Sequence, residues 1–509
     1  MHETRQEPLR AIVLAGRVLG RGDGPEAVAR FVAHGRTAEA IDQWFGRDAL
    51  LRLRDLSVAE RLGWLRAALD RDIAALDALL SAQLDAVLQH PRLTRLEGSW
   101  RGLDWLVDRM PQADSRLRVR MLNARWGEIC RDLERALEFD QSHLFRKIHD
   151  DQFGIAGGEP YGLIIGDYEV RHLPSREHPT DDVGALQRLA GIAAASFAPM
   201  LLGASPALLG MDSFADMGAT FDPAPTLAGE DHQRLRQAAM QDDMRFIGLA
   251  LPRVLGRAPW ADDGSRVDRF RYRSCTPGAA QRVWTSPVYA FAAVTLRAYE
   301  RFSWPASVRG ADVTDEASGG VVDGLPFERF ASDPLHEAPP RAPLEVALTD
   351  VQENQFGDAG LIALAALDGL PEACFGPMPS LHRPPRMRTQ EANANQRLST
   401  QFNTLLCVSR FAHCVKVMGR DMIGSFMDPG DVESRLQKWL DRFVSGGTIL
   451  DPEMTARFPL LDARVEVRER RGHPGVYNCI VHLRPQHQLD DVGASFRLVT
   501  EFAPRRAAA

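Results

Sequence analysis

Three groups of side chains in this sequence are of types that could do chemistry. Ser409 and His413 are four residues apart, so on a helix they could share a hydrogen bond as a nucleophile and its base do. Cys407, His413 and Cys414 are residue types that bind zinc. The segment Gly154-Ile-Ala-Gly-Gly-Glu-Pro is rich in glycine, as loops that hold phosphate are. Each group also has a purely structural interpretation.

The surrounding sequence favours the structural interpretation in each case. No Gly-x-Ser-x-Gly segment occurs, so a hydrolase triad built on Ser409 has no nucleophile elbow. Cys407 and Cys414 are seven residues apart, two turns of a helix, and we expect them to pack as small apolar side chains. The glycine-rich segment lacks the Gly-Lys-Ser/Thr of a phosphate loop and does not match Gly-x-Gly-x-x-Gly, so we expect a tight turn there.

Paired acidic residues have no pattern around them that would make a calcium loop or a two-carboxylate site, and we expect solvated loops or helix faces. The pairs are Asp181-Asp182, Asp242-Asp243 and Asp490-Asp491. The sequence therefore predicts no catalytic residue, no cofactor and no metal ion, and we do not expect an enzyme.

Length and composition indicate a globular protein with more than one core. The chain has 509 residues, of which 45% are hydrophobic and 25% charged. It has no stretch of eighteen uncharged apolar residues and no secretory segment after Met1, so we expect no membrane insertion and a cytoplasmic location. The six cysteines form no Cys-x-x-Cys pair, which favours reduced, mostly buried thiols. A net charge of −7 gives no reason to expect nucleic acid as a partner.

Long helices are predicted near the N-terminus, and the chain before residue 57 reads as less regular helix. Ser57 and Glu60 form a capping box ahead of a helix that we expect to run to about residue 90. Its apolar residues recur three or four positions apart, which makes one stripe. They are Leu62, Leu65, Leu69, Ile73, Leu76, Leu80, Leu84 and Leu88. A second helix follows Pro91, in which we expect Trp100 and Trp105 to be large buried anchors.

Strands and helices alternate through the middle of the chain, so we expect an α/β or α+β fold with central mixed sheet layers. The expected strands are 117–122, 161–166, 245–251 and an edge strand at 344–349, and the expected helices are 126–137 and 187–200. Residues 376–391 hold four prolines and three arginines and are predicted to be an exposed linker.

The C-terminal part is predicted to combine helices with a β-hairpin. The expected elements are a long helix at 392–422, a helix at 432–444, a hairpin of 463–469 with 477–483, and a last strand at 495–502. Strict alternation of apolar and charged residues in the hairpin indicates one buried and one solvated face.

Five segments in this order resemble the large subunit of the type VI secretion contractile sheath, the TssC/EvpB (VipB-like) family, related to phage tail sheaths. They are Leu96-Glu-Gly-Ser-Trp-Arg-Gly-Leu-Asp-Trp-Leu-Val, Gly157-Gly-Glu-Pro-Tyr-Gly-Leu-Ile-Ile-Gly-Asp-Tyr-Glu, Arg245-Phe-Ile-Gly-Leu-Ala-Leu-Pro-Arg-Val-Leu, Tyr289-Ala-Phe-Ala-Ala continuing to Trp304 and Arg309-Gly310, and Val408-Ser-Arg-Phe-Ala-His-Cys-Val-Lys-Val-Met-Gly-Arg-Asp-Met-Ile-Gly-Ser-Phe-Met. The first 55 residues carry no family motif.

The resemblance implies a structural protein that forms a helical assembly and contracts to propel an inner tube into a target cell. Its implied partners are a small sheath subunit (TssB/VipA-like), neighbouring sheath subunits, an inner tube protein (Hcp-like), a baseplate, and a disassembly ATPase (ClpV-like) through the small subunit. The alternative is a divergent paralog that caps or nucleates the sheath at the baseplate.

The resemblance also implies a division of the chain into five parts. They are a variable helical segment at 1–56, a helical region at 57–115 that packs with the small subunit, an outer α/β part at 116–375, the linker at 376–391, and an inner helix and strand domain at 392–509 for tube contact and strand exchange.

Two sets of interface residues follow from the resemblance. The helix at 432–444 is expected to face the tube with a mixed-charge face, while Leu436, Trp439, Leu440 and Phe443 dock inward. That face holds Glu433, Arg435, Lys438, Asp441 and Arg442. Val465 and Val467 are expected to donate main-chain hydrogen bonds in a sheet that strands of neighbouring subunits complete.

Overall fold

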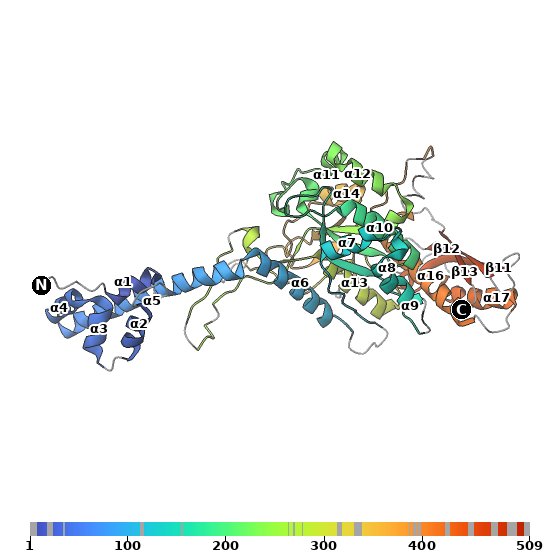
Figure 1. Cartoon of the computed structure of the whole chain (residues 1–509). Helices are drawn as coiled ribbons and strands as arrows, with labels where there is room; N and C mark the ends of the chain where they lie inside the picture. Colours follow the sequence, from blue (N-terminus) through green and yellow to red (C-terminus); the bar gives the residue numbers. More distant parts are fainter. Residues whose placement is uncertain are drawn as a thin grey trace. The chain divides into compact units, whose positions relative to one another are not determined.

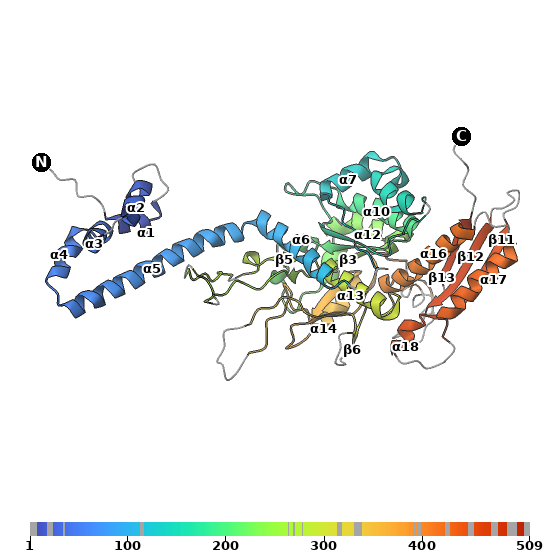
Figure 2. The same cartoon turned by 90° about the horizontal axis from the view of Figure 1, so that it is seen from below.

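The computed structural model divides the chain into two units (Figures 1 and 2). One unit holds residues 1–94 and 259–282, and the other holds 95–258 and 283–509. The structure describes residues 8–17, 24–33, 36–111, 117–153, 155, 157–262, 264–267, 270–276, 278–312, 318–329, 338–385, 387–389, 393, 396, 399–422, 428–445, 452–469, 477–485 and 496–502.

The first unit is built on α5 (Val58–Leu88), a helix of 31 residues. Its N-terminus has the predicted capping box, because Ser57 Oγ accepts from the Glu60 N–H and Glu60 Oε2 accepts from the Ser57 N–H. Four short helices precede it, as Figure 2 shows. They are α1 (Leu9–Leu14), α2 (Gly24–Ala33), α3 (Thr37–Phe45) and α4 (Arg47–Arg54). The predicted helical start of the chain is confirmed for the described residues.

The second unit is organised around a six-stranded sheet in the order β1-β2-β3-β9-β10-β8. Neighbouring strands from β1 to β9 are parallel, and the β9–β10 and β10–β8 pairs are antiparallel. Their bounds are β1 Ile164–Val170, β2 Met200–Ala204, β3 Ile247–Leu251, β8 Val321–Val322, β9 Ile362–Ala366 and β10 Ala373–Phe375. The predicted mixed α/β class is confirmed.

Helices cover both faces of this sheet and bury it in two cores. One face packs against α7 (Trp126–Arg135) and α10 (Asp182–Ser196), with Leu202 and Leu249 of the strands in the same core. The other face packs against α13 (Pro287–Phe302), whose Phe291 is fully buried. Strands that are buried on both faces have continuous apolar sequences. The apolar run Ile247–Leu251 therefore predicts a strand.

A three-stranded antiparallel sheet, ordered β11-β12-β13, lies near the end of the chain with two helices. The strands are β11 (Leu460–Glu469), β12 (Tyr477–Pro485) and β13 (Phe496–Phe502). The helices are α16 (Phe402–Met422) and α17 (Pro429–Leu440). They share a third core with one face of the sheet. The predicted hairpin is confirmed in its pairing, for example Val465 with Val481.

Short elements connect these parts. They are α6 (Pro91–Asp108), η2 (Phe139–Gln141), α8 (His143–Phe145), η3 (Arg146–Asp150), α9 (Asp151–Phe153), η4 (Pro206–Leu209), η5 (Phe214–Asp216), α11 (Pro223–Ala228), η6 (Glu230–His232), α12 (Gln233–Ala239), η7 (Asp242–Phe246), β4 (Val254–Leu255), η8 (Ala279–Gln281), β5 (Trp284–Thr285), β6 (Ala311–Asp312), β7 (Ser318–Gly319), α14 (Asp350–Ala359), η9 (Asp441–Phe443) and α18 (Pro452–Arg457).

Two predicted strands are wrong. Residues 117–122 are not in a strand, and Met121 and Leu122 are 63% and 53% exposed. Alternation sets which way side chains point, but it does not supply a neighbouring strand to pair with. In the segment 344–349 only Leu344 makes a β-bridge, to Val254, before Thr349 caps α14.

The predicted boundaries around residue 390 also differ. A break at Thr400 and Gln401 interrupts the predicted long helix. Residues 393, 396 and 399 are helical, Gln401 forms a β-bridge with Pro379, and α16 begins at Phe402. In the predicted exposed linker 376–391, Met378, Ser380 and Leu381 are buried, and the Leu381 N–H donates to the Ile247 carbonyl. This first part of the segment is therefore packed against β3, because proline-rich sequence can run extended through a core as well as over a surface.

Candidate assembly interfaces

The groups that could have done chemistry are buried and held apart. His413 Nε2 lies 2.9 Å from the Ser196 carbonyl, while Ser409 Oγ has no partner among the described residues. Cys407 Sγ accepts from Trp304 Nε1, and burial raises the pKa of this thiol to about 12. A protonated, buried thiol is unreactive. The described residues contain no group of three or more His, Cys, Asp and Glu side chains that could hold a metal ion.

The glycine-rich segment and the acidic pairs have structural roles where the structure describes them. Gly157 has a φ of +80°, and a Cβ on Gly158 would collide with the Gln152 backbone, so both shape a tight turn. Asp181 caps α10 through the Gly184 N–H. Asp182 accepts from Trp126 Nε1, Thr180 Oγ1 and the Arg171 N–H. Asp242 and Asp243 begin η7, and Asp490-Asp491 lie outside the described residues.

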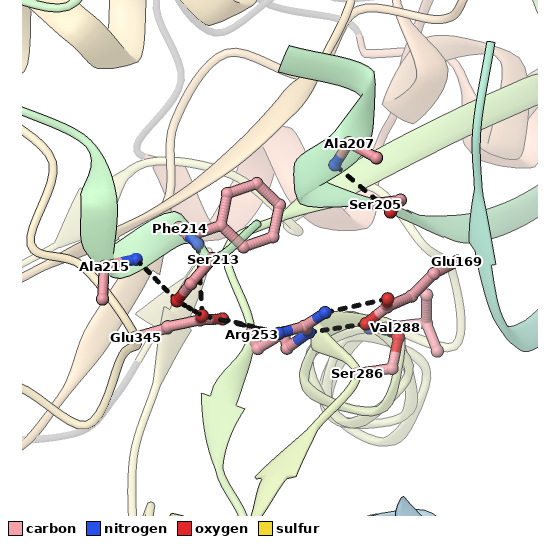
Figure 3. A network of polar contacts seen from close by, with 10 residues as sticks. All are labelled: Glu169, Ser205, Ala207, Ser213, Phe214, Ala215, Arg253, Ser286, Val288 and Glu345. Carbon is pink, nitrogen blue, oxygen red and sulfur yellow. Dashed lines mark hydrogen bonds and ion pairs between the residues drawn. The ribbon is translucent and has the colours of Figure 1, made fainter. Parts of the chain in front are cut away.

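A partly buried ion-pair network lies near the ends of β1 and β3 (Figure 3). Arg253 contacts both oxygens of Glu169, at 2.5 and 2.9 Å, and lies 3.4 Å from both oxygens of Glu345. Glu345 also accepts from the Ser213 hydroxyl and the Phe214 N–H. Burial opposes the charge on Arg253, but the hydrogen bond and charge of Glu169 outweigh it and raise the pKa of Arg253.

Within this network Glu345 is buried, whereas Arg253 and Glu169 are partly exposed. Burial raises the pKa of Glu345 despite the opposing charge of Arg253. The carboxylate occupies the start of η5, where an anion would otherwise bind. It therefore ties the segment after Leu344 to the strand ends.

The α5 stripe, which we define as Val58, Leu62, Leu69, Ile73, Leu80 and Val87, is exposed along one face of the helix. The exposed fractions of its members lie between 46% for Leu69 and 70% for Val58. The spacing of four and seven residues keeps these side chains on one line over the full helix. A continuous apolar face of this length on a single chain marks a surface for another molecule.

The other faces of α5 carry contacts from its own unit. Asp72, 2% exposed, accepts from Arg10 Nε and Trp44 Nε1. Asp85 accepts from the Tyr272 hydroxyl, and Gln89 Nε2 donates to the Cys275 carbonyl. Apolar side chains outside the α5 stripe also make contacts within the unit, because the Trp64 ring packs edge-on against Phe45 and Ala68 is buried.

Helix α6 packs through its glycines, so the expectation for Trp100 is wrong. Gly98 and Gly102 are buried, whereas Trp100 is 57% exposed. Trp105 is half-buried, and its Nε1 donates to the Gly324 carbonyl. The predicted pair of Glu97 and Arg101 is confirmed at 2.7 Å. The sequence showed a periodic apolar row, but it could not show that the glycine side of the helix approaches the core more closely.

Helix α17 closes the outer edge of β11. The Val465 N–H donates to Gln437 Oε1, and the Val467 N–H donates to Glu433 Oε2, both at 2.9 Å. Gln437 Nε2 donates in turn to the Ala463 carbonyl. Two side chains of a helix thus take the place of a neighbouring strand. In the single chain the N–H groups of Val465 and Val467 are therefore occupied by α17, and their expected part in a sheet that neighbouring subunits complete stays a prediction.

The exposed face of α17 and η9 carries basic and acidic residues, because Asp431 and Asp441 are exposed beside three cations. Arg435, Lys438 and Arg442 are exposed, three and four residues apart on the side away from the sheet. Glu433 points to β11, and Asp441 accepts from Gln437 Nε2. Leu436 and Leu440 are fully buried, and Trp439 and Phe443 pack partly buried against the same core, as predicted.

Gln437 and the glycines of α6 are the interface-defining residues that sequence reasoning missed. Gln437 lies four residues after Glu433, a spacing that puts both on one face and would have suggested a joint role. Gly98 and Gly102 have the same spacing. No local spacing in the sequence predicts the network of Glu169, Arg253 and Glu345. These residues are far apart in the sequence, and only the order of the strands in the sheet brings them together.

No helix in the described part of the chain has both the length and the hydrophobicity to cross a membrane. Exposed apolar rows on α5 and α6 are typical of a subunit of a larger protein assembly. The titratable groups of Cys407 and His413 are buried, and side chains of α17 occupy the edge of β11.

Comparison with known proteins identifies the class of assembly. The family described as EvpB/VC_A0108, tail sheath N-terminal domain, matches residues 70–382, and the EvpB/VC_A0108 tail sheath gpW/gp25-like domain matches 391–502. The type VI secretion system sheath protein TssC1 of Pseudomonas aeruginosa strain PAO1 is 33% identical over 441 residues, which are 86% of each chain. The crystal structure of a sheath tail protein from Desulfitobacterium hafniense matches 66% of this chain and 56% of its own, with 9% identity and a TM-score of 0.30.

The chain therefore belongs to the EvpB tail sheath family, and it is a structural subunit of a sheath.

His413 gives this fold a pH dependence that can be measured. Burial, together with Arg410 and Lys416, lowers its pKa from the ordinary 6.5 to about 4, although the Ser196 carbonyl opposes the shift. The unfolded chain binds the proton first, so the stabilisation is complete above about pH 6.5 and is lost as the pH falls toward 4. It amounts to about 3 kcal/mol. We expect His413→Gln, whose amide can still donate to Ser196, to flatten this part of the profile.

The measurement is urea unfolding at pH 7 and pH 5 for both proteins, followed by circular dichroism. Comparing the two proteins removes the contribution of other buried histidines such as His382, whose pKa burial also lowers. Equal losses of stability in the two proteins between pH 7 and pH 5 would contradict the assignment.

Proposed function

We propose that this chain is the large subunit of a type VI secretion contractile sheath. It assembles with a small sheath subunit around an inner tube, and contraction of the assembly propels the tube into a target cell. The observation that carries the proposal is the α5 stripe, an apolar face that the chain's own contacts avoid. The 33% identity to a type VI sheath protein over 86% of both chains supports the same assignment.

The α5 stripe is the surface that we assign to the small subunit. Burying six large apolar side chains at about 25 cal/mol per Å² of apolar surface provides a large driving force for association. Such a surface also makes the chain alone prone to aggregation, so we expect it to be soluble only with its partner. A large subunit that purifies alone as a stable monomer with cooperative melting would contradict this role.

Ile73→Asp tests the α5 stripe directly. Ile73 is 55% exposed and away from Asp72, so the helix should remain folded while the small subunit no longer co-purifies from cells that express both. The matched control is Ala82→Asp, an exposed position on the opposite side of α5. We expect the control to co-purify normally. Equal recovery of the small subunit with both variants would refute the assignment.

The three exposed basic residues Arg435, Lys438 and Arg442 of α17 and η9 form the surface that we assign to the inner tube. A row of three exposed cations fits an acidic surface, and exposed pairs of about 0–1 kcal/mol each would set register without fixing the tube permanently. A charge reversal that tests this surface should change the basic residues and leave Glu433 in place, because Glu433 accepts from the Val467 N–H at the edge of β11.

We expect the triple reversal of Arg435, Lys438 and Arg442 to Glu to leave the circular dichroism spectrum of the heterodimer unchanged. It should reduce sheath formation on purified tubes, because it replaces attraction with repulsion. The control keeps the charge, with Arg435→Lys and Arg442→Lys. The amount of sheath that pellets per tube is measured at low and at high salt. Raised salt should also reduce sheath formation by the parent protein, because it screens exposed charges. A triple variant that pelleted like its control would exclude this face.

Strand exchange, implied by the family, has an open edge at β13. In an antiparallel ladder the N–H groups of successive residues point to alternate sides. The N–H groups of Val465 and Val467 point away from β12, so by register those of Arg497, Val499 and Glu501 point away from it at the other edge. No further strand of the described residues pairs with β13. We therefore place an incoming strand beside β13, since unpaired edges attract extended segments.

Val499→Pro removes one outward donor of β13, whereas Leu498→Pro removes a donor to β12. We expect Val499→Pro to leave the heterodimer folded but to prevent its polymerisation. The neighbouring variant Leu498→Pro should instead lower the stability of the heterodimer itself. Sedimentation of co-expressed subunits and circular dichroism separate the two effects. Normal sheath yield with Val499→Pro would show that this edge stays unpaired in the assembly.

Electron microscopy of the co-expressed pair separates this function from its main rival. Long striated tubes support a sheath subunit, whereas discrete complexes support a paralog that caps or nucleates the sheath at the baseplate.

A further inference from the structure

The outward face of α6 carries a second row of large apolar side chains. Leu96, Trp100 and Val107 are 56%, 57% and 48% exposed, and Leu103 between them is half-buried. We call these four residues the α6 seam. Its spacing of four, three and four residues is that of the a and d positions of a coiled coil, in which the apolar row faces another helix.

The helix cannot turn to bury this row. A Cβ on Gly98 would collide with the Trp284 carbonyl oxygen, and one on Gly102 would collide with Thr285 Oγ1 and the Tyr289 ring. These contacts allow only glycine at positions 98 and 102, and Leu106 is buried on the same side of α6. Further along, Trp105 Nε1 donates to the Gly324 carbonyl, and Arg109 donates to the carbonyls of Asp323 and Gly324.

Polar contacts fix the rotation of α6 as well. Arg257 Nε lies 2.6 Å from Glu97 Oε1, and both side chains are largely buried. The exposure of the α6 seam is thus set by the contacts on the other side of the helix. An exposed tryptophan at the centre of an apolar row is also the residue type that most often dominates binding energy at interfaces.

Charges beside the seam oppose the dipole of α6 itself. The first turn of the helix has no acidic residue and the last turn has no basic one. Instead, exposed Arg95 lies toward the N-terminal end, and exposed Asp104 and Asp108 lie toward the C-terminal end. A helix prefers the reverse arrangement, by about 0.3–1 kcal/mol per charge. Such a local conflict is expected where a binding surface has been selected.

A second helix that runs antiparallel removes the conflict. Its N-terminal end, which is positive, would lie beside Asp104 and Asp108, and its negative C-terminal end would lie beside Arg95. A parallel helix would instead place its ends against charges of the same sign.

We propose that the α6 seam binds one amphipathic helix of the small sheath subunit, and that this helix runs antiparallel to α6. The inference rests on the proposed function, since that function supplies the partner chain. It adds a surface separate from the α5 stripe and fixes the kind of element that docks there and its direction.

Photo-crosslinking from the seam identifies the occupant. Leu96→Cys and Val107→Cys are made singly in a Cys275→Ser background, since Cys275 is the exposed native thiol among the described cysteines. Each is labelled with a benzophenone in the co-purified complex. We expect both probes to crosslink to a single helix of the small subunit. The site reached from position 107 should precede the site reached from position 96 by about ten residues, because a helix rises 1.5 Å per residue.

Substitution of Trp100 measures how much the seam contributes. Trp100→Asp should lower recovery of the small subunit at least tenfold, roughly the loss expected at the centre of an interface. The matched variant Trp100→Phe keeps an aromatic side chain and should recover near-normal amounts. Because Trp100 is exposed, both variants should give the circular dichroism spectrum of the parent chain.

Each other outcome overturns a defined part of the account. Crosslinks to a second copy of this chain, to two different elements, or in the parallel order refute the proposal. If Ile73→Asp abolishes binding while Trp100→Asp does not and the seam probes stay unlinked, the seam is wrong and the proposed function stands. If the parent chain never binds the small subunit, the proposed function itself fails.

Discussion

The close approach of α6 to β5 and α13 through Gly98 and Gly102 determines what this chain presents to other molecules. Without side chains at these two positions, the helix backbone lies against Trp284, Thr285 and Tyr289. The apolar row of the helix is then left on the outside. The same division holds on α5, where polar contacts through Asp72 and Asp85 serve the unit and the apolar stripe is exposed. Exposed apolar helices are costly for a lone chain, and a subunit that assembles recovers that cost on binding.

The sheet near the C-terminus applies the same constraint to hydrogen bonds. Glu433 and Gln437 satisfy backbone groups at the β11 edge that a strand would otherwise satisfy. Side chains of α17 therefore close the β11 edge. Among the described residues, no further strand pairs with the outer edge of β13. We propose that a neighbouring subunit extends the sheet at the β13 edge, in the head-to-tail manner of a helical assembly.

Regular local patterns were predictable from the sequence, whereas contacts between distant residues were not. The capping box at Ser57 and the alternation around Val465 each depend on a few neighbouring residues, so their elements were predicted correctly. The buried face of α6 depended on how near two glycines come to another segment, and amphipathic patterning pointed to the opposite face. Likewise, nothing local distinguishes Val465, whose N–H meets a helix side chain, from a strand residue in a ladder.

The central claim is that the exposed apolar face of α5 and the open edge of β13 serve one ordered assembly with a small partner subunit. Electron microscopy of this chain co-expressed with that subunit tests it most directly. The account predicts long, striated tubes from the parent proteins, and discrete complexes without tubes when Val499 is replaced by proline. A parent chain that stays a stable monomer in the presence of the small subunit, with no tubes in the micrographs, would contradict it.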